Sequence, residues 1–158
     1  RDGGGVLLAR DREHFQSALG ENKAVDIVAL GPGRELWLLE QKDYRVHPRT
    51  KQIELALEMA QKVRDTLAGL FAAAKFFAQH ANQTEAQSSL QADRVRVVLH
   101  IEQPKRHSKL FPREYDLARL QQKLKQLVRP VDPHPLVVEL ASLRGLPWSA
   151  AAVPGGVP

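Results

Sequence analysis

Residues 24–42, AVDIVALGPGRELWLLEQK, decide the fold of this chain because they read as two hydrophobic strands joined by a turn. The first strand ends at the turn Gly31-Pro32-Gly33-Arg34, and the second strand follows directly. Charged residues are costly inside hydrophobic strands unless they are paired, neutralised or bound to a metal. Asp26, Glu40 and Lys42 therefore mark this strand pair as the place where chemistry is expected.

The register of the strand pair decides whether these charges meet. Side chains alternate between the faces of a strand, so Glu40 and Lys42 share one face. If a three-residue loop sets Gly31 opposite Glu35, Asp26 lies opposite Glu40, with the two Cβ atoms roughly 5 Å apart. A two-residue loop shifts the register by one and separates the carboxylates across the sheet. The sequence allows either loop, and the constellation depends on the first.

An acid on one strand and Glu-X-Lys on the next resemble the active site of the PD-(D/E)XK nuclease superfamily. The matching residues are Asp26 and Glu40-Gln41-Lys42, while Val25 replaces the proline of the motif. The resemblance covers roughly residues 10–101. It implies an α/β fold with a restriction-endonuclease-like core, in which helices flank a central mixed β-sheet in the order αβββαβ. The first helix of that family often offers a further glutamate, and Glu13 stands at the matching place.

The resemblance also implies a chemistry, the hydrolysis of phosphodiester bonds with Mg²⁺ or Mn²⁺. Asp26, Glu40 and the backbone carbonyl of Gln41 would hold the metal, and Lys42 would orient or deprotonate the attacking water or stabilise the charged phosphate. Glu13 would hold a second ion or a metal-bound water. The alternative is a plain cross-strand salt bridge on a solvated sheet face, with the helix glutamate exposed.

Three further stretches, residues 42–45, 62–69 and 127–135, resemble a group of uncharacterised bacterial proteins. That likeness bears on the fold and says little about the substrate.

Composition predicts a soluble, cytoplasmic protein. The 158 residues suit a single domain over residues 1–148 with a flexible tail over residues 149–158. No apolar run approaches the roughly 20 residues that a membrane crossing needs. The first ten residues are too short and interrupted for a signal peptide, and a chain that opens on Arg is expected to be a fragment or a processed product. Cysteine is absent, which excludes disulfides and thiolate metal sites.

The pattern along the chain predicts helices, strands and loops in alternation. We expect a short helix over 11–19, a long helix over 51–79, a surface loop over 81–93, a strand over 94–101, a helix over 113–128, and a strand or helical turn over 136–140. The apolar stripe of the long helix is predicted as Ile53, Leu57, Ala60, Val63, Leu67, Leu70, Ala74 and Phe77. Its wetter side is predicted as Lys51, Glu54, Glu58, Lys62 and Asp65.

Two basic loops, over residues 45–51 and 105–113, are candidates for contacts with nucleic-acid phosphates. They carry Arg45, Arg49, Lys51, Lys105, Arg106, Lys109 and Arg113. Tyr44 is a candidate for stacking on a base, with packing under the long helix as the alternative. The net charge of +5 agrees with a polyanionic partner. For any single basic residue, an ordinary solvated loop is the competing interpretation.

The favoured function is a metal-dependent nuclease acting on DNA, with the setting of bacterial restriction, repair or anti-phage defence resting on the resemblance alone. The expected partners are DNA, other subunits or a larger parent chain, and a second copy in a homodimer, with no membrane. The first alternative is a catalytically silent protein of nuclease fold that binds DNA or another protein. The second is an interaction module of unrelated α/β fold.

Overall fold

The computed structural model describes the backbone of residues 6–8 and the side chains of residues 23–76, 83–110, 112–143, 146, 148 and 149. Its elements follow in the order β1 (Val6–Leu8), β2 (Ile27–Gly31), β3 (Glu35–Asp43), α2 (Leu55–Phe76), α3 (Gln83–Leu90), β4 (Arg94–Glu102), α4 (Leu117–Val128), β5 (Leu136–Val138) and a 3-10 helix, η1 (Leu140–Ser142).

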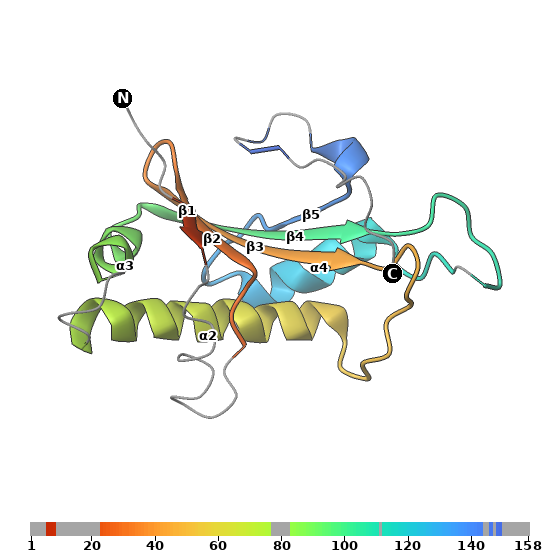
Figure 1. The fold of residues 1–158 in the computed structure, drawn as a ribbon, viewed down its shortest axis with the longest axis horizontal. Helices are drawn as coiled ribbons and strands as arrows, with labels where there is room; N and C mark the ends of the chain where they lie inside the picture. Colours follow the sequence, from red (N-terminus) through yellow and green to blue (C-terminus); the bar gives the residue numbers. More distant parts are fainter. Residues whose placement is uncertain are drawn as a thin grey trace.

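The five strands form one mixed sheet in the order β1-β2-β3-β4-β5. The first three strands are antiparallel neighbours, and β3, β4 and β5 run parallel. Parallel neighbours need a crossover, and α2 with α3 supplies the one between β3 and β4. Both α2 and α4 lie on the same face of the sheet (Figure 1). The predicted α/β architecture with a central mixed sheet and flanking helices is confirmed at this level.

The β2–β3 hairpin adopts the first of the two registers that the sequence allows. Gly31 lies opposite Glu35, so Pro32-Gly33-Arg34 form the three-residue loop. Gly33 has φ 72° and Arg34 has φ 57°, so both adopt the left-handed conformation that a short hairpin loop requires. Gly31 itself packs against the ring of Trp37, where an added Cβ would meet Nε1 at 2.6 Å. Loop geometry and this close approach together fix the pairing.

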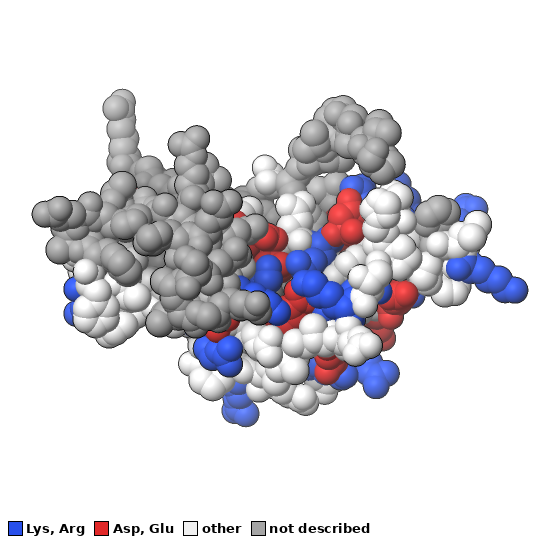
Figure 2. Space-filling model, turned by 60° about the horizontal axis from the view of Figure 1, so that its bottom comes forward, with Lys and Arg blue, Asp and Glu red and all other residues white. Residues whose placement is uncertain are grey.

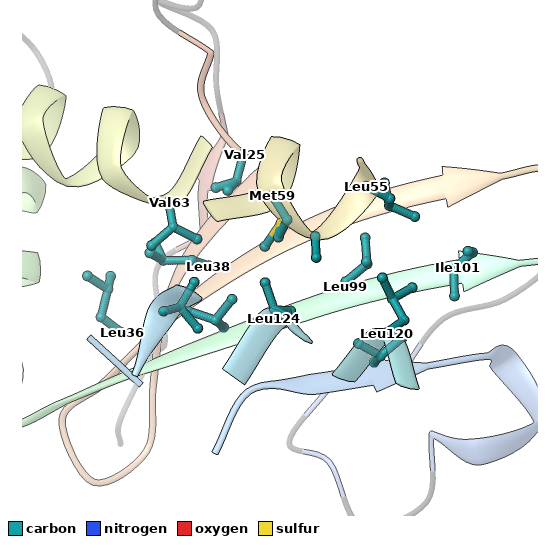
Figure 3. Close-up of a cluster of buried hydrophobic side chains, with 14 residues drawn as sticks. Val25, Leu36, Leu38, Leu55, Met59, Val63, Leu99, Ile101, Leu120 and Leu124 are labelled. Atoms are coloured by element: carbon teal, nitrogen blue, oxygen red, sulfur yellow. The ribbon is translucent and has the colours of Figure 1, made fainter. Parts of the chain in front are cut away.

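The main core lies between the sheet and the two helices, and Figure 3 shows side chains from α2, α4, β3 and β4 pointing toward one another there. The apolar stripe predicted for the long helix is confirmed in large part. Val63 and Ala74 are buried, and Ala60, Leu67 and Leu70 pack against the core. Leu57 is instead 40% exposed, and Leu55 and Met59 are buried in its place. Glu58, predicted for the wetter side, is buried as well, and Phe77 lies outside the described residues.

Two further segments differ from what the sequence predicted. Residues 83–90, expected in a surface loop, form α3, which packs against α2. A helix of eight residues, six of them polar, has too little periodicity to be recognised. The undecided segment at 136–140 contains β5 and the start of η1. The helix expected over 11–19 and its Glu13 lie outside the described residues, as do residues 150–158 of the expected tail.

The opposite face of the sheet carries a smaller core around Trp37, Leu39, Val98 and Val138. Leu146 and Trp148, from the segment after η1, pack against this cluster. Among the described helices, none combines the length and hydropathy that a membrane crossing requires.

Candidate functional site

Asp26 lies beside β3 near Glu40. It directly precedes Ile27, the first residue of β2, which pairs with Leu39 of β3. The backbone N–H of Gln41 donates to Oδ2 of Asp26 at 2.9 Å, which holds this carboxylate at the edge of β3. Glu40 shares a face with Leu36 and Leu38, whose side chains belong to the core under α2.

Glu40 is the most deeply placed charge of the site, with 1% of its surface exposed. Its Oε1 accepts from the ammonium group of Lys62 at 2.5 Å and also pairs with Lys42. Its Oε2 is buried, and no hydrogen-bond partner for that oxygen is found within the described part of the chain. Because a buried carboxylate is costly without compensation, the two ammonium groups at Oε1 are what balances the charge of Glu40.

Lys42 shares the face of Glu40 and stays charged. Burial lowers the pKa of Lys42, but its hydrogen bond to Glu40 and the negative charges of Glu40, Glu58 and Asp26 outweigh burial and raise the pKa above its ordinary value of 10.5. In this arrangement the side chain is a fixed positive charge and a hydrogen-bond donor. It is not a base at neutral pH.

Lys62 approaches Glu40 from α2 and was not predicted as a site residue. Its backbone carbonyl accepts from the hydroxyl of Thr66 at 2.7 Å, and that hydroxyl accepts from the N–H of Val25 at 3.0 Å. One turn of α2 is thereby tied to the residue that precedes Asp26. The helix and the strand pair position their charges as one rigid unit.

A second buried carboxylate, Glu58, lies one turn before Lys62. Its two oxygens pair with Lys51 at 2.6 Å and with Arg49 at 2.5 Å. Burial raises the pKa of Glu58, but the hydrogen bonds and charges of Lys51 and Arg49 outweigh it and lower the pKa to about 2. Arg49 also donates to the carbonyl of Ile53 at 2.7 Å, so Glu58 anchors the loop between β3 and α2.

The residues predicted to bind nucleic acid divide into two groups. Tyr44 packs on the ring of Tyr115 at 5.7 Å and accepts from Arg49, whose side chain is only 6% exposed. These two residues serve the protein interior, and for Tyr44 the packing alternative describes its position. The exposed members, which remain accessible to a ligand, are Arg45 (paired with Asp43), Lys51, Lys105, Arg106, Lys109 and Arg113 (paired with Glu139).

The two basic loops leave the same end of the sheet, because β3 and β4 are parallel and both loops follow the carboxyl ends of these strands (Figure 1). This edge of a parallel pair is where α/β proteins bind ligands. Turned to show the face that carries α2, the molecule presents acidic and basic side chains interspersed across its middle, rather than a uniformly basic surface (Figure 2). Cations and carboxylates thus lie side by side on this face.

The donor set fits Mg²⁺ or Mn²⁺ and does not fit zinc. Within the described residues there is no group of three or more histidine, cysteine, aspartate or glutamate side chains close enough to share an ion. Mg²⁺ in proteins is typically held by one or two carboxylates together with waters and substrate phosphates. Asp26 and Glu40 are two such carboxylates, and Oε2 of Glu40 has no hydrogen-bond partner among the described residues. With the carbonyl of Gln41, they are the residues that would hold it.

Sequence reasoning missed Lys62 and Glu58, although a signal was present. Counted from Leu55, a helical face takes every third and fourth residue. That face contains Leu55, Glu58, Met59, Lys62, Val63 and Thr66. Two charges and a hydroxyl on an otherwise apolar face of a helix indicate buried polar partners on the sheet that it covers.

Comparison with known proteins gives a partial relationship. The chain is 33% identical over 150 residues to a protein of Neisseria meningitidis (serogroup A, serotype 4A) named cysteine–tRNA ligase. The match covers 82% of this chain and 21% of the ligase, so the chain spans about a fifth of the length of that relative. No family model matches the sequence, and no solved structure matches the fold.

Proposed function

We propose that this protein is a metal-dependent nuclease that hydrolyses phosphodiester bonds in DNA. The observation that carries the proposal is the placement of Asp26, held by the N–H of Gln41, next to Glu40, whose buried Oε2 has no hydrogen-bond partner among the described residues. Two lysines reach the same carboxylate from different elements. Two acids and two cations in one partly covered site are the groups that phosphoryl transfer requires.

Each residue has a role that follows from its position. A bound Mg²⁺ or Mn²⁺ supplies an acidified water and neutralises phosphate charge. Asp26, oriented by the N–H of Gln41, and Glu40 bind the ion. Lys42, whose pKa is raised, donates to the charged phosphate oxygen rather than removing a proton from water.

The order of elements supports a restriction-endonuclease-like core. β1, β2, β3, α2 and β4 follow one another as the βββαβ part of the αβββαβ pattern, and β4 runs parallel to β3. We propose this finer assignment on the order and directions of the strands. In this chain α3, α4 and β5 add to the pattern.

The test is cleavage of supercoiled plasmid, single-stranded DNA and tRNA with Mg²⁺ or Mn²⁺ against EDTA. We include tRNA because the partial relative is named as a tRNA ligase. Glu40→Gln and Lys42→Met should each lower the rate by about 10²-fold or more, since each removes a charge from the reacting centre. Glu54→Gln is the matched control, because Glu54 pairs with Lys123 on the surface, away from the site. Metal-independent cutting, or cutting that survives Glu40→Gln, would refute the proposal.

A second candidate is a catalytically silent protein of this fold that binds DNA or another protein. The observation in its favour is that Glu40 is already paired with two ammonium groups, as in a purely structural ion-pair cluster. This candidate predicts no metal-dependent cleavage and no loss of DNA binding in Glu40→Gln. The bacterial defence or repair setting, and a partner subunit or second copy, belong to the first proposal and rest on the resemblance.

A further inference from the structure

Lys62 is placed where it competes with a metal ion. Its ammonium group lies 2.5 Å from Oε1 of Glu40, and its side chain is 12% exposed. Lys42 shares the same oxygen. Two positive charges at one carboxylate oppose the entry of a divalent cation at the other oxygen of that carboxylate, because the repulsion acts over a few Å in a partly buried site.

The position of Lys62 is built into the fold. The hydroxyl of Thr66 links the carbonyl of Lys62 to the N–H of Val25, and Asp65 accepts from the N–H of Lys23 at 3.1 Å. Two adjacent residues of α2, Asp65 and Thr66, thus hold the chain that leads into Asp26. The ammonium group, at the end of a flexible stem, is the part of Lys62 that is able to leave while its backbone stays fixed.

A phosphodiester offers these ammonium groups another partner. Both phosphate oxygens and carboxylate oxygens accept charge-assisted hydrogen bonds from the lysine ammonium group. When a nucleic-acid phosphate enters the site, Lys62 can turn from Oε1 of Glu40 to the phosphate, which lowers the positive charge at Glu40 and leaves the carboxylate to the metal. Substrate and metal then favour each other's binding, and by linkage the coupling is reciprocal.

We propose that Lys62 couples divalent-cation binding to nucleic-acid binding, because its ion pair with Glu40 opposes the metal until a phosphodiester draws the ammonium group away. We call this ion pair the latch. Lys62 is a positioning residue in this scheme, because it acts on the metal through Glu40. The proposal rests on the proposed function and adds the order of its events: the site holds its metal weakly until a phosphodiester is present.

The experiment measures Mn²⁺ affinity by calorimetry, with and without a phosphorothioate oligonucleotide that resists cleavage. Wild type should bind Mn²⁺ about tenfold more tightly when the oligonucleotide is present. Lys62→Met should bind Mn²⁺ about tenfold more tightly than wild type without the oligonucleotide, and the oligonucleotide should add little. Lys123→Met is the matched control, since Lys123 also pairs with a glutamate but on the surface of α4, and it should behave as wild type.

Lys62→Gln provides a second variant, since it keeps a donor for Glu40 and removes only the charge. Thermal unfolding of each variant shows that the fold is retained. If Mn²⁺ binds to wild type and Lys62→Met equally, or more weakly to Lys62→Met and Lys62→Gln, the latch is refuted while the metal site stands. If neither wild type nor the variants bind Mn²⁺ under any condition, both the latch and the proposed nuclease are refuted. If Lys62→Met binds Mn²⁺ but wild type does not bind it even with the oligonucleotide present, Lys62 blocks the metal without coupling it to nucleic acid, and the proposed coupling is refuted.

Discussion

At the scale of single residues, the site is an ion-pair cluster in which each buried carboxylate has two cationic partners. Glu40 takes Lys42 and Lys62, and Glu58 takes Lys51 and Arg49. Removing one partner of a buried pair leaves an uncompensated charge, which typically costs 3–5 kcal/mol. The cluster therefore contributes to stability as well as to function, and the two contributions respond to different substitutions.

The lowered pKa of Glu58 predicts how the stability of the fold depends on pH. Its pKa falls from 4.5 to about 2 on folding, so its contribution is present above pH 4.5 and is lost as pH falls toward 2. The shift corresponds to roughly 2–3 kcal/mol. In Glu58→Gln, we expect lower stability at pH 7 and a flatter loss between pH 4.5 and 2, measured by urea unfolding across pH. Glu54→Gln, at the surface, should keep the slope of wild type; an unchanged slope in Glu58→Gln would contradict this account.

The hydroxyl of Thr66 is expected to make a second contribution to the stability of the fold, one that involves no charge. Its buried hydroxyl accepts from the N–H of Val25, so Thr66→Val leaves that donor without its partner. An unsatisfied buried donor costs about 1–3 kcal/mol. Thr66→Ser retains the hydroxyl and should cost less, and urea unfolding of the two variants measures the difference. A loss in Thr66→Ser as large as that in Thr66→Val would contradict this account, because the methyl group would then contribute as much as the hydroxyl.

At the scale of elements, the two strands and the turn of the hairpin were predictable, but their register was not. The turn Gly31-Pro32-Gly33-Arg34 allows a two-residue or a three-residue loop, and the structure has the three-residue loop. Strand β4 was predictable from its β-branched residues. The inner face of α2 was predicted only in part, because Glu58 and Lys62 look solvent-exposed until the partners on β3 and in the preceding loop are known.

The residues of the candidate site that lie close together in the sequence were predictable, and the residues that lie far from them in the sequence were not. Asp26, Glu40 and Lys42 lie within one hairpin, whereas Lys62 reaches Glu40 across 22 positions and Thr66 reaches Val25 across 41. Contacts of that separation are set by how α2 packs on the sheet, which periodicity alone does not define. Arg49 was assigned to a phosphate rim because its loop is basic, but its partner is the buried Glu58.

Gly31 provides the test of the hairpin. A Cβ at this position would meet Nε1 of Trp37 at 2.6 Å and Cδ1 at 2.9 Å, and Trp37 is itself buried. We expect Gly31→Ala to lower the free energy of unfolding by about 1–3 kcal/mol through overpacking. Pro32→Ala, at an exposed position of the same loop, should cost less than about 1 kcal/mol. Thermal and urea unfolding compare the two, and a neutral Gly31→Ala would show that the ring of Trp37 moves freely.

At the scale of the whole molecule, the parallel β3 and β4 bring the acids and both basic loops to one edge of the sheet. The exposed cations of the second loop, Lys105, Arg106 and Lys109, lie beyond the carboxyl end of β4. They are placed to contact the backbone of a nucleic acid that enters the site, where they would add affinity without sequence preference.

Replacing Lys105, Arg106 and Lys109 together by alanine should therefore weaken DNA binding for all sequences alike. If all three contact phosphates, a plot of the logarithm of the DNA association constant against the logarithm of the salt concentration should have a slope that is shallower by about 2–3. Fluorescence anisotropy at several salt concentrations measures that slope. An unchanged slope would show that this loop is an ordinary solvated loop.

The central claim is that Asp26 and Glu40 act as one unit across the strand pair, and a double-mutant cycle of metal-dependent DNA cleavage tests it most directly. The rates of wild type, Asp26→Asn, Glu40→Gln and the double variant are compared under the same Mn²⁺ concentration. Residues that share one catalytic function are strongly non-additive, so either single change should reduce the rate about as much as both together. Independent losses that multiply in the double variant, or cleavage that neither single change reduces, would contradict the account.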